Sequence, residues 1–291
     1  MPLVQTPKSA ASIPLIASIG PLATGTAAWL VDVWGVIHNG VRPFAEACAA
    51  CTRFRAGGGL VVLVSNSPRP RDSVAAQLDR IGVPRTSWDA IVTSGDVART
   101  LIGRYAGRPI LHLGPERDLP TLAGLDVERV GAEAADAIIC TGLFDDERET
   151  PDDYAATLQL CAARGLPMIC ANPDITVERD GHIVYCAGAL ARAYEEIGGA
   201  VAYAGKPYAP IYTLTFETLE ELRLGSADRA RLLAIGDGVH TDIAGAAVAG
   251  VRSLFVASGV HVNGGLDSAA VEGLFPADGP RPIAAMAKLV W

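Results

Sequence analysis

The chain has 291 residues, half of them hydrophobic, and is therefore long enough for one large domain or two smaller ones. Its 24 basic and 32 acidic side chains give a formal net charge of −8, which argues against non-specific binding to nucleic acids or anionic membranes. It contains no uninterrupted apolar run of about 18 residues that would predict a membrane span, and its N-terminus lacks the regions of a signal peptide.

Short apolar runs alternate with segments of helical length and composition along most of the chain. In the first 96 residues we predict strands at 29–33 and 60–64, and helices at 44–56 and 71–81. From residue 200 onward we predict strands at 200–203, 232–235 and 253–256, and helices at 211–224 and 243–249. Strands that alternate with helices predict an α/β domain with a mainly parallel sheet.

The middle of the chain has an alternation of its own. There we predict strands at 110–113, 137–140, 168–171 and 182–184, and helices at 150–164 and 189–197. About 100 residues are enough for a domain. We therefore expect a discontinuous α/β core at 1–96 and 200–291, with a second α/β domain inserted at 97–199.

The six cysteines do not suggest a disulfide scaffold in a chain of this length, so we expect reduced thiols and a cytoplasmic protein. Cys48 and Cys51 form a CxxC pair within a predicted helix. Because no second ligand pair accompanies them, packing is a better interpretation than zinc or redox chemistry. Cys140, Cys170 and Cys186 lie in apolar surroundings and are expected in the core.

Four short polar segments occur along the chain, each directly after an apolar run. They are Asp32 with the four residues that follow it, Ser65-Asn66, Lys206 between a glycine and a proline, and Gly236-Asp237-Gly238 with Asp242. Each alone has an ordinary interpretation, as a helix cap, a surface lysine or a turn. Together they supply the acids, the hydroxyl and the ammonium that hold a magnesium ion beside a phosphoryl group.

Ligands of open α/β sheets bind beyond the carboxyl ends of the strands, where these segments are expected. A carboxylate at Asp32 can attack phosphorus to form an aspartyl-phosphate, or give an oxygen to magnesium. We expect Ser65, Asn66 and Lys206 to bind the phosphate, and Lys206 also to offset charge between nucleophile and phosphate. Asp237 suits direct binding of Mg²⁺, and Asp242 suits binding through water or orienting Asp237.

In this order, the four segments resemble the four motifs of the haloacid dehalogenase (HAD) superfamily. The long segment between the second and third motifs resembles the class IIA members, the NagD-type nucleotide and sugar phosphatases and the pyridoxal-phosphate phosphatases. Three further segments resemble recurring class IIA segments, at 93–95, 171–174 and 186–189. The resemblance implies a Rossmann-like core with an inserted cap of type C2, a Mg²⁺ cofactor and phosphatase activity. It also implies that the backbone carbonyl of Trp34 binds the metal.

Trp34 is the departure from that pattern. Phosphatases of the superfamily carry a second aspartate at this position, which protonates the leaving group and activates water, a role worth roughly 10²–10⁴-fold. An indole cannot transfer a proton in this way. Two kinds of group are candidates for this proton transfer: the imidazole of His38 in the same loop, or a cap carboxylate such as Asp174 or Glu178. Arg69 is a candidate for contact with substrate, or an exposed loop residue.

The resemblance leaves several functions to weigh. Dehalogenases also carry an aromatic residue at position 34 but use no metal, so the retained Asp237 and Asp242 argue against them. Carbon–phosphorus cleavage usually needs a cap lysine, and 97–199 contains none. We therefore predict a magnesium-dependent phosphatase of a small phosphorylated metabolite, with a homodimer as its expected assembly. The alternative is a binding protein that senses a phosphometabolite because Trp34 has abolished efficient turnover.

Overall fold

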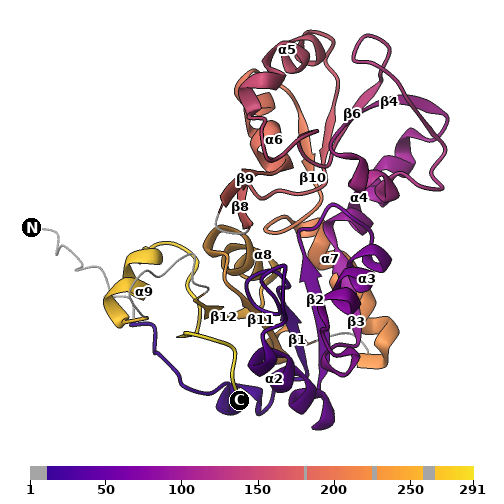
Figure 1. The fold of residues 1–291 in the computed structure, drawn as a ribbon. Helices are drawn as coiled ribbons and strands as arrows, with labels where there is room; N and C mark the ends of the chain where they lie inside the picture. Colours follow the sequence, from indigo (N-terminus) through magenta and orange to yellow (C-terminus); the bar gives the residue numbers. More distant parts are fainter. Residues whose placement is uncertain (1–11, 180–181, 225–227, 258–265) are drawn as a thin grey trace, which may run out of the picture.

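The computed structural model describes residues 12–179, 182–224, 228–257 and 266–291 (Figure 1). The N-terminal residues 1–8, in which no signal peptide is expected, lie outside these ranges. Within them, a six-stranded sheet has the order β13-β12-β11-β1-β2-β3, and every neighbouring pair is parallel. Its strands are β1 (Ala28–Val31), β2 (Leu60–Ser65), β3 (Ala90–Thr93), β11 (Leu232–Gly236), β12 (Arg252–Val256) and β13 (Ala284–Met286).

Helices cover both faces of this sheet. On one face, α2 (Ala45–Ala56) and α3 (Arg71–Ile81) bury their apolar side chains against β1, β2 and β11. Trp29 of β1 stacks on Phe54 of α2 with ring centroids 4.0 Å apart. The opposite face is covered by α4 (Ser94–Ile102), α7 (Ala209–Leu219) and α8 (Ala244–Ala249). Two short helices, α1 (Gly20–Ala23) and α9 (Ser268–Leu274), lie near the ends of the described chain.

A second, five-stranded parallel sheet is built from the middle of the chain, in the order β10-β7-β6-β4-β5. Its strands are β4 (Arg108–Leu113), β5 (Val127–Arg129), β6 (Ala137–Cys140), β7 (Met168–Cys170) and β10 (Val201–Tyr203). Its outer face packs on α5 (Ala155–Ala163) and α6 (Ala187–Glu196). An antiparallel hairpin of β8 (Thr176–Arg179) and β9 (His182–Tyr185) follows β7. Figure 1 shows the second sheet stacked above the first.

The α/β class with parallel sheets is confirmed, but one strand lies elsewhere than expected. The sequence predicts the run at 200–203 as a strand of the first sheet, whereas β10 pairs with β7 in the second, with Val201 opposite Met168. The chain enters β10 directly from α6, which packs on the second sheet, so the nearest free edge is that of β7. The expected boundary at residue 97 also falls inside α4. The division into a core and a cap at these residues stays a prediction.

The two sheets share one hydrophobic cluster. It includes Val64 and Val92 from the first sheet and Ile139 and Ile169 from the second, all buried. Helix α4 lies between them and contacts both β3 and β7. Cys48 and Cys51 are buried on α2, and the cysteines of the second sheet are buried as well, all as free thiols. None of the helices in the described ranges has the length and apolarity needed to cross a bilayer.

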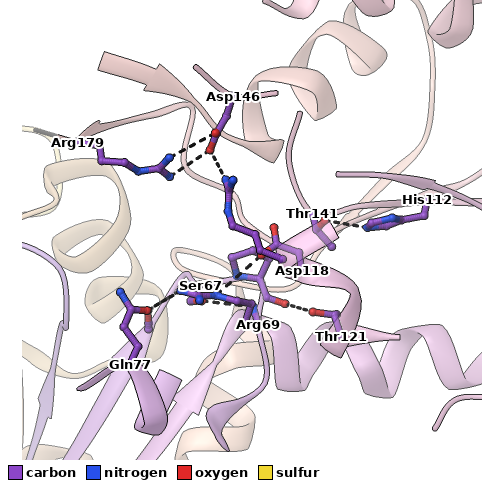
Figure 2. A network of polar contacts seen from close by, with 12 residues as sticks. Ser67, Arg69, Gln77, His112, Asp118, Thr121, Thr141, Asp146 and Arg179 are labelled. Carbon is purple, nitrogen blue, oxygen red and sulfur yellow. Dashed lines mark hydrogen bonds and ion pairs between the residues drawn. The ribbon is translucent and has the colours of Figure 1, made fainter. Parts of the chain in front are cut away.

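A polar network also connects the two sheets (Figure 2). The loop after β2 contains Arg69, which donates a hydrogen bond to Gln77 at 2.5 Å. Arg69 also lies 3.9 Å from the carboxylate of Asp118, in the segment that follows β4 of the second sheet. Beside it, the Thr121 hydroxyl donates to the carbonyl of Pro68 at 2.6 Å. Arg69 is thus engaged with protein groups rather than fully exposed.

Candidate active site

Three polar side chains stand at the carboxyl ends of three neighbouring strands. Asp32 follows β1, Ser65 ends β2 and Asp237 follows β11. Because β11, β1 and β2 are parallel neighbours, their ends lie at one edge of the sheet. The chain runs from β1 through β2 to β3 and later returns to β11 on the other side of β1. This edge is therefore a topological switch point, where α/β proteins bind their ligands.

Lys206 joins two of the acids. It lies in the connection from β10 to α7, and its side chain is almost fully buried. Its Nζ donates to Asp32 Oδ1 at 2.5 Å, to Asp242 Oδ1 at 2.7 Å and to the Val64 carbonyl at 3.0 Å. Burial disfavours the ammonium, but Asp242 and Asp32 outweigh it and hold the pKa of Lys206 above its usual value. The lysine is therefore a permanent cation in this site.

Asp32, Asp237 and Asp242 form a carboxylate cluster whose ligand atoms lie within 4.8 Å of one another. Burial raises the pKa of Asp32 well above its usual value; Asp242 and Asp237 raise it further, whereas Lys206 opposes them. The cluster thus holds more negative charge than one lysine offsets. Oxygen donors with surplus negative charge fit a hard divalent cation such as Mg²⁺ or Ca²⁺.

Gly35 allows the loop after β1 to lie close to Asp237, which follows β11. Its φ of +84° is a conformation that side chains disfavour, and a Cβ there would lie 2.1 Å from Asp237 Oδ2. Asp242 is held from the other side, because the backbone N–H of Gly238 donates to its Oδ2 at 3.1 Å. The positions of both acids are therefore set by backbone contacts.

Ser65 and Asn66 differ in what they contact. Ser65 Oγ accepts the N–H of Ser67 at 3.1 Å, which leaves its hydroxyl proton for another acceptor. Asn66 instead binds both backbone groups of Lys206, as acceptor at 2.7 Å and as donor at 3.1 Å. Its Nδ2 also donates to Asp174 Oδ1 at 2.9 Å. These three bonds occupy the amide and make Asn66 a support for the Lys206 segment.

Sequence reasoning missed the contact of Asn66 with Lys206 and with Asp174. The partners lie 140 and 108 residues away in the chain, and no spacing or periodicity links them. The only sequence signal was that 171–174 resembles a recurring class IIA segment.

The loop after β1 is closed by Trp34. Its indole lies edge-on to the His38 ring, with centroids 5.4 Å apart, and a Cβ on Gly40 would lie 2.4 Å from it. His38 is buried, and its Nδ1 accepts the N–H of Gly40 at 2.8 Å. Burial lowers the pKa of His38 to about 4, so the imidazole is neutral at pH 7. The ring therefore holds the loop together, and the Trp34 carbonyl as a metal ligand stays a prediction.

The fold and the site together define an α/β protein with an acidic cluster suited to a metal ion, and comparison with known proteins identifies the family. The family model described as haloacid dehalogenase-like hydrolase matches residues 29–128, and a second, HAD-hydrolase-like, matches 203–278. A haloacid dehalogenase-like hydrolase from Brucella suis 1330 is 48% identical, over 95% of this chain and 100% of that one, with a TM-score of 0.86. The chain belongs to the haloacid dehalogenase-like hydrolase family.

Two further relatives are named as phosphatases. D-glycerol 3-phosphate phosphatase of Mycobacterium tuberculosis is 28% identical over 236 residues, which are 80% of this chain and 63% of that protein. The chain therefore spans less than two thirds of that relative. The structure of a glycerol phosphate phosphatase from Mycobacterium tuberculosis in complex with magnesium is 25% identical over 91% of this chain and 75% of that one, with a TM-score of 0.68.

Proposed function

We propose that this protein is a magnesium-dependent phosphatase that hydrolyses the phosphate ester of a small metabolite through an aspartyl-phosphate at Asp32. The observation that carries the proposal is the contact of the Asp32 carboxylate with the Lys206 ammonium, 2.5 Å away, inside a cluster of three acids. A buried carboxylate at a switch point, with a fixed cation beside it, is arranged for nucleophilic attack.

Each residue has a part in the reaction. Asp32 attacks phosphorus, the bond to the ester oxygen breaks, and water later attacks the same phosphorus to release phosphate. The Ser65 hydroxyl holds a phosphoryl oxygen, and the Lys206 ammonium, whose three hydrogens bind Asp32, Asp242 and the Val64 carbonyl, offsets the charge that develops on the phosphoryl group. Asn66 keeps Lys206 in place through its two backbone bonds. Asp32, Asp237, Asp242 and the Trp34 carbonyl would hold Mg²⁺, which supplies positive charge to the phosphoryl group.

The relatives and the second sheet support a proposed substrate class. A relative named for glycerol phosphate supports a small phosphate ester, and we expect a sugar phosphate, a nucleotide or an aryl phosphate. The side of the molecule built around the second sheet would exclude water and select the substrate. A homodimer and a cytoplasmic location remain predictions from the sequence.

The test is phosphate release from a panel of phosphate monoesters and p-nitrophenyl phosphate, with Mg²⁺ or with EDTA. We expect Mg²⁺-dependent turnover in the wild type and at least a 10³-fold loss in Asp32→Asn, because no other group replaces the nucleophile. Asp79→Asn is the matched control, since that aspartate is exposed on α3 and pairs with Arg85. Turnover in EDTA, or in Asp32→Asn at the wild-type rate, would contradict the proposal. The phosphatases among the relatives do not favour the alternative of a binding protein.

A further inference from the structure

The proposed reaction needs a proton at the leaving oxygen, and the loop after β1 does not provide one. Trp34 carries no acidic proton. His38 is buried, and its Nδ1 is already engaged by the Gly40 N–H within the same loop. An acid for this reaction must therefore come from another element.

The loop that follows β7 brings one carboxyl group to the edge of the site. Asn66, next to Ser65, donates to Asp174 Oδ1 at 2.9 Å, and the same Asn66 amide binds the backbone of Lys206. The loop also lies directly on Gly205, where a Cβ would come within 2.7 Å of the Pro173 ring. Asp174 is therefore fixed against the segment that carries the catalytic lysine.

From this position we propose that Asp174 is the proton donor and acceptor of the reaction, the role that Trp34 cannot perform. The inference rests on the proposed function. The protonated Asp174 gives its proton to the ester oxygen as the bond from that oxygen to phosphorus breaks and the Asp32–phosphorus bond forms. The Asp174 carboxylate then takes a proton from the water that attacks phosphorus. The Asp32–phosphorus bond breaks, and phosphate leaves with Asp32 as a carboxylate.

Two properties of Asp174 suit this exchange. Only its Oδ1 is hydrogen bonded within the described ranges, so its Oδ2 has no hydrogen-bond partner there. The pKa of Asp174 is raised, mainly by burial. The hydrogen bond from Asn66 and the charge of Lys206 lower this pKa, whereas the charge of Asp242 raises it. A carboxyl with a raised pKa that keeps part of its surface exposed can both give a proton and recover one from solvent.

Glu178, the other acid considered for this role, lies further along the chain. It is exposed on β8, where its backbone pairs with Ile183 of β9. No contact within the described ranges joins its side chain to Asp32, Ser65 or Lys206. The placement of the two carboxyls thus favours Asp174.

The test compares esters with good and poor leaving groups in wild type and Asp174→Asn. We expect kcat/KM for an alkyl phosphate such as glycerol phosphate to fall by about 10²-fold or more, and that for p-nitrophenyl phosphate by less than about 10-fold, because nitrophenolate needs no proton to leave. Asp152→Asn is the matched control, an exposed aspartate on the same side of the molecule. An equal fall for both esters identifies Asp174 as a positioning residue and overturns the proposal, as does no change.

A second variant separates a lost acid from a damaged fold. In Asp174→Ala, formate added to the assay supplies a carboxyl group in the space left by the side chain. We expect formate to raise the alkyl phosphate rate at least several-fold in this variant and to leave the wild-type and Asp152→Asn rates unchanged. A rate that formate does not raise overturns the proposal. Absence of turnover in the wild type would instead contradict the proposed function itself.

Discussion

The Lys206 ammonium offsets negative charge of Asp32 and Asp242 in the candidate site. Its ammonium lies between two buried carboxylates and uses all three of its hydrogens in bonds to Asp32, Asp242 and the Val64 carbonyl. A buried ion pair adds little net stability over an apolar pair, but removing one partner leaves the other charge uncompensated. Lys206 is therefore expected to stabilise the fold, in addition to its proposed role in the reaction.

Lys206→Met is expected to lower the free energy of unfolding by about 3–5 kcal/mol in EDTA, because Asp32 and Asp242 lose their shared cation. Mg²⁺ should then raise the Tm of the variant more than that of the wild type, since the metal supplies the missing positive charge. Thermal melts with Mg²⁺ and with EDTA measure both effects. Lys288→Met is the control, because that lysine is largely exposed. An equal Mg²⁺ shift in Lys206→Met and wild type would contradict this account.

Gly35→Ala is expected to weaken Mg²⁺ binding, because the added methyl group would lie 2.1 Å from Asp237 Oδ2 and displace that carboxylate. The positive φ alone costs roughly 1–2 kcal/mol. Gly25→Ala separates the two effects, since Gly25 has a φ of +80° with nothing near its missing Cβ. Calorimetric titration with Mg²⁺ should show weaker binding in Gly35→Ala alone. Equal Mg²⁺ affinity in both variants would show that Asp237 is no ligand or moves freely.

Among the elements, the segment after β4 links the second sheet to the loop that follows Ser65. Asp118 lies there, buried and 3.9 Å from Arg69, and Asp146 nearby binds Arg179 at 3.1 Å and also Arg117. Figure 2 shows this chain of contacts running from the β2 loop to β8. The network thus positions the elements on both sides of the candidate site.

Asp118→Asn is expected to stabilise the protein at neutral pH. Burial raises the pKa of Asp118 to about 6, so its ionised form is disfavoured in the folded state. The free-energy cost of keeping ionised Asp118 buried is largest above pH 6. This cost disappears as the pH falls below about 4, the pKa of an aspartate in the unfolded chain. The variant should gain about 1–3 kcal/mol at pH 7.5 and little at pH 4. Urea unfolding at both pH values measures the gain, and Asp152→Asn should show none. A gain that is equal at both pH values would rule out ionisation as its cause.

At the scale of the whole molecule, the shared hydrophobic cluster couples the two sheets. All four tryptophans belong to the first sheet and its helices and loops, whereas Leu190 is buried on α6 under the second. Val64 and Ile139 belong to one buried cluster, so loss of one sheet exposes apolar surface of the other. The molecule is therefore expected to unfold in one transition.

Leu190→Ala is expected to cost about 2–5 kcal/mol and to shift the unfolding midpoint by tryptophan fluorescence and by far-UV circular dichroism equally. Fluorescence reports the first sheet and dichroism reports both. The substitution lies outside the first sheet, so the fluorescence midpoint moves only if the sheets unfold together. A fluorescence midpoint that stays at the wild-type value would show two independent units.

The parallel α/β class, most strand and helix positions and the four polar segments could be predicted from the sequence, because they follow from local periodicity and from residue types at strand ends. Helix α3 begins and ends at the predicted residues, whereas β3 and β13, with four and three residues, lack enough pattern to be predicted. The sheet to which β10 belongs, the support that Asn66 gives to Lys206 and the place of Asp174 were decided only by the tertiary structure. Each depends on contacts between residues far apart in the chain, which pairing and packing select and no local pattern encodes.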